Sequence, residues 1–530
     1  MAGIDFRNHM PTRVFAPLFA IGFLAACVPN HAIQTASLNS IEAPTSVSAS
    51  ESATPEITPT TVEGPVLSYR VAAFYYPWYG NPTIDGQWFH WTQNNHVPPD
   101  DIASDYFPAL GAYSSNDPQV VAEHMKWLRE AGIGVIVTSW WGQGSKEDRV
   151  VPLLLQTAEP YGIKVAFHIE PYKGRTPESL VSDVKYIYEQ YGSSPAFFRS
   201  TETSRYSPSD QSKGMFFVWS IQAQGNDFSS WRKAMDEIHA LPERGLVIAN
   251  SLESGWIEGS HFDGLYNYAT LHLEKDGFNW AKSLPPDSLY VPSVIPGFSA
   301  KRVGYADTTY VPRDNGNTYE KQWGQALGTG VEPAMVTITS FNEWHEGSMI
   351  EPPQSGASDG NGYTYADLGA LPPEGYLTLT HNWIDKFLST SWPSTFRARL
   401  QMTTTSDWTT LNVVNGGAWI RPERVSATDS TTTAGMEAGD RFLLTQSLTD
   451  ANRGKEVEMT WDVLLTGLVP GQDFILQIDR GNIGKTQVTI FNYLGETPIE
   501  ITRFEWDQII GGRNSHQITI PMELLTAANP

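Results

Sequence analysis

Short apolar runs alternate with longer segments of helical periodicity through the middle of the chain. Apolar runs of this length, bounded by polar and turn residues, are typical of buried β-strands. The eight predicted strands are Val71–Tyr76, Ile133–Trp140, Ile163–Ile169, Met215–Ile221, Gly245–Asn250, Phe262–Tyr268, Leu289–Ile295 and Met335–Phe341. The helices predicted between them include Pro118–Ala131, Pro177–Tyr191, Ser229–Ala240 and Tyr319–Leu327, and a last helix is expected near Tyr376–Leu388.

This order of elements predicts an α/β fold. Eight strand–helix units fit the roughly 250 or more residues that a closed barrel of parallel strands needs. We therefore predict a (β/α)8 TIM barrel over residues 67–392. A doubly wound parallel sheet is the alternative.

The pattern changes after Trp392. Helical periodicity stops, and short alternating runs follow at Phe442–Thr445, Val457–Leu465, Phe474–Ile478 and Gln487–Asn492. Glycine and proline turn signals separate these runs. We expect residues 393–530 to form an all-β sandwich, which is a candidate carbohydrate-binding domain.

The N-terminus carries a pattern typical of export. Arg7 and Arg13 precede an apolar run that ends in the string Leu-Ala-Ala-Cys27. The string resembles the lipobox of bacterial lipoproteins, in which the cysteine is lipidated and becomes the mature N-terminus. We expect residues 1–26 to be a lipoprotein signal peptide, Cys27 to be the lipidation site, and residues 27–66 to be a Ser/Thr/Pro-rich linker. The expected location is a membrane surface, either at the cell surface or facing the periplasm.

Composition narrows the class of partner. The 530 residues are 40% hydrophobic and 18% charged, which fits a folded protein and excludes a polytopic membrane protein. Asp and Glu number 58 against 35 Lys and Arg, so the net charge is -23 and a nucleic acid backbone would be repelled. Cys27 is the only cysteine, which excludes an intrachain disulfide and a cysteine-based zinc site. The 18 tryptophans and the aromatic content of 12% suit the flat apolar faces of sugars.

Aromatic and acidic residues follow most of the predicted strands. In a parallel barrel the chemistry lies at the carboxyl ends of the strands. The residues found there are Tyr75–Tyr79, Ser139–Trp141, His168–Tyr172, Trp219, Tyr266–Tyr268 and Phe341–Gly347. Any single ring is more often a core residue than a ligand contact. Their repetition at one mouth of the barrel indicates a carbohydrate site.

Two glutamates stand three positions apart directly after the last predicted strand. Glu343 and Glu346 can both face the barrel mouth, and paired carboxylates are what cleavage of a glycosidic bond needs. One of the two must hold a proton at the working pH, which burial and a neighbouring negative charge favour. Two glutamates at this spacing are common on helix surfaces. The prediction therefore depends mainly on the surrounding string, Ser-Phe-Asn-Glu-Trp-His-Glu-Gly347.

That string closely resembles the signature of glycoside hydrolase family 99, the endo-α-1,2-mannosidases and mannanases. Further strings agree in order along the chain, at Phe74–Gly80, Tyr113–Pro118, Val137–Trp141, His168–Tyr172, Phe262–Tyr268 and Ile350–Pro352. The resemblance covers about residues 70–388 and leaves the C-terminal portion out. It implies a retaining, metal-independent hydrolase on a (β/α)8 barrel that cuts internal α-mannosidic, α-1,2-type linkages of mannan or mannose-containing glycans.

The resemblance also implies residue roles. Glu343 is expected to act on the 2-hydroxyl of the mannose that is cleaved, so that this oxygen attacks the anomeric carbon and forms a 1,2-anhydro sugar. Glu346 is expected to protonate the leaving oxygen and later to activate water. The expected substrate-binding residues are Tyr76, Trp78, Trp140, Trp141, His168, Glu170, Tyr266, Tyr268, Asn342 and His345. Tyr268 is favoured as the hydroxyl beside the reacting sugar, and Tyr266 faces the same way by strand alternation.

No metal or cofactor is expected. His90, His96 and His345 show no metal-ligand spacing, and Asp359–Tyr363 departs from the calcium-loop pattern. The expected partners are a mannose-containing polysaccharide or glycan and, through the lipid, a membrane, and the protein is expected to be a monomer. Two alternatives stay open, a non-catalytic glycan-binding surface lipoprotein and a family-99-like hydrolase of another surface polysaccharide.

Overall fold

The structure is a computed structural model that describes residues 65–222, 227–268, 277–285, 287–304 and 310–392, together with ten strands between Ser394 and Ile520. Cys27 and the predicted signal peptide lie outside the described residues, as do residues 27–64 of the predicted linker.

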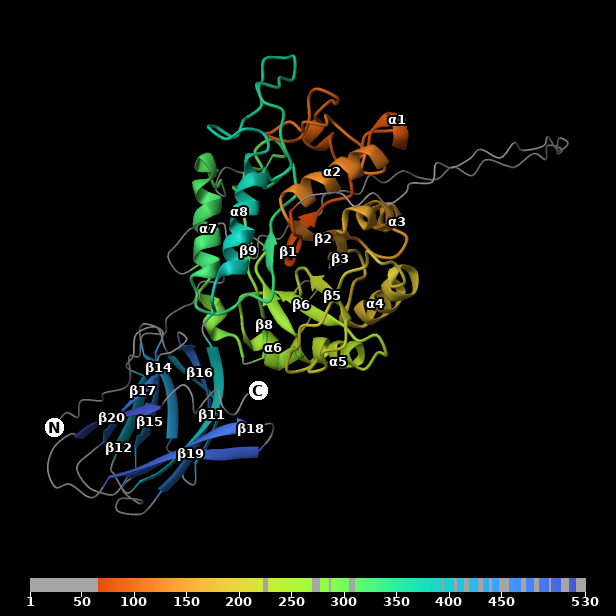
Figure 1. Ribbon diagram of the computed structural model, residues 1–530. Coiled ribbons are helices and arrows are strands. Elements are labelled where there is room, and N and C mark those ends of the chain that lie inside the picture. Colours follow the sequence, from red (N-terminus) through yellow and green to blue (C-terminus); the bar gives the residue numbers. More distant parts are fainter. Residues whose placement is uncertain are drawn as a thin grey trace, which may run out of the picture. The chain divides into compact units, whose positions relative to one another are not determined.

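Parallel strands form the barrel at the centre of the first portion (Figure 1). They are β1 (Ser68–Tyr75), β2 (Ile133–Trp140), β3 (Lys164–Ile169), β5 (Lys213–Val218), β6 (Leu246–Asn250), β7 (Gly264–Tyr266), β8 (Leu289–Val291), β9 (Ser293–Val294) and β10 (Val336–Ile338). The short β4 (Arg199–Ser200) pairs with β5 in the antiparallel sense. Each of the eight predicted strands overlaps an observed one, and the seventh corresponds to β8 and β9 together.

Pro292 divides the seventh strand and explains how the barrel closes. β8 pairs with β7 on one side, and β9 pairs with β10 on the other. Proline has no N–H to donate to a ladder, but the carbonyl of Pro292 still accepts from the backbone N–H of Thr337 at 2.9 Å. Because β10 also pairs with β1, the sheet returns to its first strand. The predicted barrel is confirmed, and the doubly wound alternative is wrong.

Helices cover the outside of the sheet (Figure 1). They are α2 (Pro118–Glu130), α3 (Lys146–Ala158), α4 (Pro177–Tyr191), α5 (Phe228–His239), α6 (Gly255–Ser260), α7 (Asn317–Leu327) and α8 (Gly375–Ser389), with the short α1 (Pro82–Asp85) in the loop after β1. Single 3-10 turns lie at Gln93–Asn95, Glu159–Tyr161, Asn279–Ser283 and Asp314–Gly316. The five helices named from the sequence are all present, and α1, α3 and α6 are additional to them.

Local sequence accounts for these elements. All eight residues of β2 are buried, as expected for a strand that is covered on one face by helices and on the other by the barrel interior. Helix α2 begins where the side chain of Asp117 accepts from the N–H of Gln119, and it buries Val121, Met125 and Leu128, which share one face. The barrel core is therefore continuous with the inner face of its helices.

The second portion is all β, as predicted. Its strands are β11 (Ser394–Thr404), β12 (Trp408–Val413), β13 (Trp419–Ala427), β14 (Thr432–Glu437), β15 (Arg441–Ser447), β16 (Val457–Leu468), β17 (Phe474–Arg480), β18 (Thr486–Leu494), β19 (Thr497–Trp506) and β20 (Asn514–Ile520). They form two antiparallel sheets, in the orders β13-β16-β11-β18-β19 and β14-β15-β12-β17-β20. Alternate residues are buried, such as Leu400 and Met402 in one sheet and Leu476 and Ile478 in the other, which gives this portion its own core.

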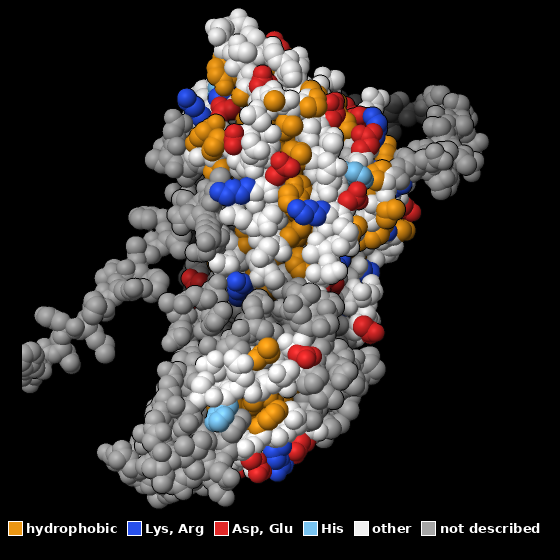
Figure 2. Space-filling view, turned by 60° about the vertical axis from the view of Figure 1, so that its left-hand side comes forward, with side chains coloured by type: hydrophobic (Ala, Val, Ile, Leu, Met, Phe, Trp, Pro, Cys, Tyr) orange, Lys and Arg blue, Asp and Glu red, His pale blue; other side chains and the backbone are white. Residues whose placement is uncertain are grey.

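The surface of the described portions shows no single sign of charge on the face drawn in Figure 2. Lys and Arg side chains are interspersed there with Asp and Glu, and hydrophobic side chains form narrow strips. Within the described ranges, no helix is long and apolar enough to cross a membrane.

Candidate active site

The loop that follows β10 carries the two predicted catalytic glutamates. We call residues 340–351 the carboxylate loop. Its two ends meet, because the backbone N–H groups of Ile350 and Glu351 donate to the carbonyl of Phe341 at 3.0 and 2.8 Å. The hydroxyl of Ser340 accepts from the backbone N–H of Glu343 at 2.7 Å. The loop is therefore closed on itself at the carboxyl end of the barrel.

Glu343 is buried in this loop with one oxygen unused. The side chain is 3% exposed. Its Oε1 accepts from the backbone N–H of His345 at 3.0 Å and lies 3.4 Å from the Nδ1 of the same residue. Its Oε2 is buried and has no hydrogen-bond partner among the described residues. A buried acceptor without a partner is costly, so this oxygen is available to a substrate hydroxyl.

Glu346 has a half-buried side chain and different electrostatics. Burial raises the pKa of its carboxyl well above the usual value, and the negative charges of Glu343 and Glu170 raise it further. This shift favours the protonated form of the carboxyl, which is the form that a general acid needs.

A third carboxylate comes from the end of β3. Glu170 is 5% exposed, and its Oε1 accepts from the hydroxyl of Ser139 at 2.8 Å. The Nδ1 of His168 lies 3.1 Å from the same oxygen. Ser139 in turn accepts from the indole N–H of Trp141 at 3.1 Å, so the ends of β2 and β3 are joined at the site.

Two tyrosines lie within electrostatic reach of all three carboxylates. The hydroxyls of Tyr76 and Tyr268 are hydrogen-bonded to each other. Burial raises the pKa of both phenols well above the usual value, and the charges of Glu170, Glu343 and Glu346 all add to the shift. Both phenols therefore stay protonated, and they lie within electrostatic reach of every carboxylate of the site.

An aromatic wall stands beside the carboxylate loop. The ring of Trp78 stacks on His90 with centroids 4.6 Å apart and lies 4.6 Å from the ring of Tyr76. The Nε2 of His345 donates to the carbonyl of His90 at 3.0 Å. Burial lowers the pKa of His90 well below its usual value, so this imidazole is uncharged. The half-buried Trp78 presents the kind of apolar face that sugars stack on.

Three of the predicted substrate-binding residues are fully buried and need a correction. Asn342 clamps Tyr76, accepting from its backbone N–H at 2.7 Å and donating to its carbonyl at 3.1 Å. The hydroxyl of Tyr266 is bonded to the Nε2 of His168 at 2.6 Å inside the barrel. Trp140 packs against Tyr186 of α4 and donates to Asp148 at 2.7 Å. With no exposed surface, these three can orient neighbours but cannot contact a sugar.

Two further glutamates were not singled out from the sequence. Glu147, in the first turn of α3, is 9% exposed; burial raises the pKa of its carboxyl and the charge of Glu170 adds to the shift. An acidic residue at this position of a helix is ordinary, so the sequence carried no signal. Glu351, quoted only as part of a motif, is 1% exposed and accepts from Tyr113 and Trp344, both at 2.8 Å. It braces the carboxylate loop from inside the barrel.

No cluster of three acidic, histidine or cysteine side chains in the described ranges could hold a metal ion. Asp359, in the segment compared with a calcium loop, instead accepts from the backbone N–H groups of Asn361 and Tyr363 at 2.8 and 3.0 Å. Its carboxylate stabilises a local turn.

Comparisons with known proteins agree with this geometry. The pattern described as glycosyl hydrolase family 99 matches residues 66–389. Glycoprotein endo-α-1,2-mannosidase of Mus musculus is 36% identical over 373 residues, which cover 61% of this chain and 76% of that protein. Glycoprotein endo-α-1,2-mannosidase-like protein of Danio rerio is 32% identical over 413 residues, which cover 68% of this chain and 86% of that protein.

A solved structure is similar to the barrel portion. The endo-α-mannosidase of Bacteroides thetaiotaomicron is 33% identical, with a TM-score of 0.54, and the match covers 61% of this chain and 98% of that chain. The matched region of the family pattern runs from the start of β1 to the end of α8 and so includes the whole carboxylate loop. The predicted resemblance is thereby confirmed: this chain belongs to glycosyl hydrolase family 99 and is a glycoside hydrolase.

Proposed function

We propose that this protein is a retaining endo-acting hydrolase of α-mannosidic, α-1,2-type linkages in mannan or mannose-containing glycans. The observation that carries the proposal is the contrast within one loop, where burial and neighbouring charges raise the pKa of Glu346 and Glu343 offers a buried oxygen without a hydrogen-bond partner among the described residues. The names of the relatives from Mus musculus and Bacteroides thetaiotaomicron support the choice of sugar.

In the first step of the proposed reaction, Glu343 takes the proton of the 2-hydroxyl while the 2-oxygen attacks the anomeric carbon. Glu346 gives its proton to the leaving oxygen as the glycosidic bond breaks, and a 1,2-anhydro sugar results. In the second step Glu346 takes a proton from water, the water oxygen attacks the anomeric carbon, and Glu343 returns its proton to the 2-oxygen. Two displacements at one carbon give retention. The attacking hydroxyl belongs to the substrate itself, so little entropy is lost in bringing it to the reacting carbon.

The test is digestion of a panel of α-mannans and mannose-containing glycans, with the released oligosaccharides identified by mass and linkage. Internal cleavage with retained configuration in the first-formed product supports the proposal. Release of single terminal sugars would rule out endo action, and inversion would rule out the two-step route. Cleavage of a polysaccharide without mannose, with every mannan intact, would favour the alternative substrate class.

We further propose that the protein is exported and held at a membrane by lipid on Cys27. The position of the only cysteine at the end of an apolar segment supports this location.

A further inference from the structure

The segment between β9 and α7 lies over the carboxylate loop. We call residues 295–304 and 310–313 the clamp segment. Phe298 and Val311 exchange backbone hydrogen bonds, both 2.9 Å long, and pack with Ile295 and Ala300 in a small core of their own. The segment is therefore supported independently of the barrel core.

Three hydrogen bonds join the clamp segment to the backbone that surrounds the proposed acid. The N–H of Ser299 donates to the carbonyl of Glu346 at 2.7 Å. The Nη2 of Arg313 donates to the carbonyls of Gly347 at 2.9 Å and Met349 at 2.6 Å. Contact is close: Gly347 has a φ of +57°, and a Cβ added there would lie 2.9 Å from the carbonyl oxygen of Ser299.

Arg313 is an unusual residue for such a buried position. It is 6% exposed, and its guanidinium lies between the rings of Tyr106 and Tyr376, 4.8 and 4.7 Å from their centroids. The hydrogen bonds of its Nη2 all go to residues of the carboxylate loop, and its Nε and Nη1 have no hydrogen-bond partner among the described residues. Among the described residues, no carboxylate forms an ion pair with the guanidinium of Arg313.

A buried cation without a counter-charge is costly. An apolar side chain of similar volume could fill the space between the two tyrosines without that cost. What the guanidinium adds is a pair of donated hydrogen bonds to the two peptides that follow Glu346.

We propose that Arg313 is a positioning residue for Glu346: it fixes the backbone behind the general acid and so aims its proton at the leaving oxygen. The inference rests on the proposed function, because it assigns the acid role to Glu346. A misplacement of about 1 Å can cost on the order of a hundredfold in rate, so the loss of these bonds should appear in the step that transfers the proton.

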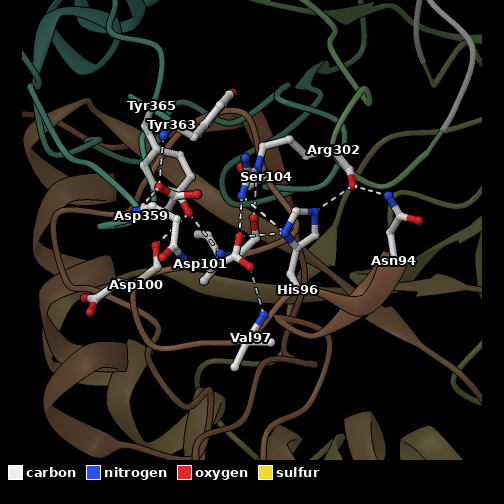
Figure 3. A network of polar contacts seen from close by, with 12 residues as sticks. Asn94, His96, Val97, Asp100, Asp101, Ser104, Arg302, Asp359, Tyr363 and Tyr365 are labelled. Carbon is white, nitrogen blue, oxygen red and sulfur yellow. Dashed lines mark hydrogen bonds and ion pairs between the residues drawn. The ribbon is translucent and has the colours of Figure 1, made fainter.

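Arg302 provides a matched control on the same segment (Figure 3). Its Nη2 lies 2.5 Å from Asp101, its Nε donates to the carbonyl of Ile102 at 3.0 Å, and it stacks over Tyr363 at 4.0 Å. His96 lies between them, 2.6 Å from Asp101 and 2.9 Å from the carbonyl of Arg302. This network holds the clamp segment to the loop after β1, and none of these bonds reaches the carboxylate loop.

The experiment compares Arg313→Met, Arg313→Lys and Arg302→Met on two α-mannosides with the same glycone, one with a sugar leaving group and one with an activated leaving group that needs no protonation. We expect Arg313→Met to lower kcat by about tenfold or more on the sugar leaving group, with KM changed by less than about threefold, and to lower it far less on the activated one. Arg313→Lys should recover part of the loss, because an ammonium can donate one bond. Arg302→Met should affect both substrates equally.

Equal losses on the two leaving groups in Arg313→Met, or no loss, would overturn the inference. If Arg313→Met does not fold, Gly347→Ala displaces the same peptide through the Ser299 contact and must show the same dependence on the leaving group. Failure of the wild-type protein on every mannoside would instead contradict the proposed function, so the two failures are distinguishable.

Discussion

Glu343 and Glu346 are three residues apart on one loop, yet their surroundings suit them to opposite tasks. Glu343 accepts from a backbone N–H and leaves one oxygen unpaired among the described residues, whereas burial and two acidic neighbours raise the pKa of Glu346. Environment, and not residue type, separates an acid from a base. Substitutions of these two residues test the separation of the proposed acid and base roles.

Substitution of the two glutamates should have unequal consequences for an activated substrate. Glu346→Gln removes the proton donor, so a leaving group that needs no proton should restore a large part of the first-step rate. Glu343→Gln removes the group that activates the 2-hydroxyl and should not be rescued. Single-turnover kinetics on aryl and sugar leaving groups measure the difference; equal rescue of both variants would contradict the assigned roles.

A 2-deoxy-2-fluoro mannoside adds a control on the same pair. It lacks the attacking hydroxyl, so no turnover and no covalent adduct on the protein are expected. A mass increase located on Glu343 would show an enzymatic nucleophile instead.

The pH profile should respond to Glu170. The charge of Glu170 helps to raise the pKa of Glu346, and the acid role proposed for Glu346 requires its protonated form. kcat/KM should therefore fall as pH rises through that raised pKa. Glu170→Gln removes one negative charge, so the pKa of Glu346 should fall. The alkaline limb of the pH profile should then move to lower pH by on the order of one unit. At neutral pH, kcat/KM should be at least about tenfold lower than in the wild type. Glu147→Gln is the matched control, because Glu147 does not contribute to the shift of Glu346. An alkaline limb at the same pH in wild type and Glu170→Gln would count against this coupling.

At the scale of elements, α3 is joined to its neighbours through one buried carboxylate. Asp148 accepts from the indole of Trp140 on β2 and from the hydroxyls of Tyr186 and Tyr191 on α4, all at 2.7 Å. It also accepts from the backbone N–H of Gly144 at 2.8 Å. Four donors on one buried group make it the junction between β2, α3 and α4.

Asp148→Ala should destabilise the barrel by at least about 3 kcal/mol, because it leaves several buried donors without an acceptor. Asp148→Asn keeps one acceptor oxygen and should cost less. Urea unfolding followed by tryptophan fluorescence measures both. Activity per folded molecule at low temperature should be close to wild type, and a loss of stability below about 1 kcal/mol in the alanine variant would contradict the role of this junction.

At the scale of the whole molecule, the barrel and the β-sandwich each bury apolar residues of their own. β10 pairs with β1, α8 ends at Ser389, and the first strand of the sandwich begins at Ser394. Portions with separate cores and a short connection usually fold as separate units.

A chain that ends at residue 393 should therefore be soluble and should retain turnover on a small mannoside. A chain that ends at residue 380, inside α8, is the control. It should fail to fold, because it removes Ile384 and Phe387 from the core. Insolubility of the first truncation would show that the two portions depend on each other.

The proposed attachment to a membrane also concerns the whole molecule. Cys27→Ser should take up no labelled fatty acid, because the thiol that carries the lipid is gone, and each buried CH₂ of a lipid chain contributes about 0.8 kcal/mol to membrane binding. The variant should either keep its signal peptide or appear as released protein. Unchanged labelling would refute the assignment of Cys27.

The sequence by itself determined the elements and their order. Strand and helix periodicity depend on residues close together in the chain, so the eight barrel strands and the five named helices could be read directly. The motif after β10 likewise identified Glu343 and Glu346. At the sandwich, the four named runs fall within β15 to β18, and the other six strands were not named from the sequence.

Only the tertiary structure decided which side chains face the site and how their pKa values are shifted. Trp140 and Trp141 are neighbours at the end of a strand buried on both faces, so hydrophobicity could not tell that Trp140 turns to Asp148 and Trp141 to Ser139. The pKa of Glu346 is raised in part by Glu170, which follows another strand, and the backbone beside Glu346 accepts hydrogen bonds from Arg313 of another loop. Burial and charge act through space, over contacts between residues far apart in the chain, and local sequence patterns do not record them.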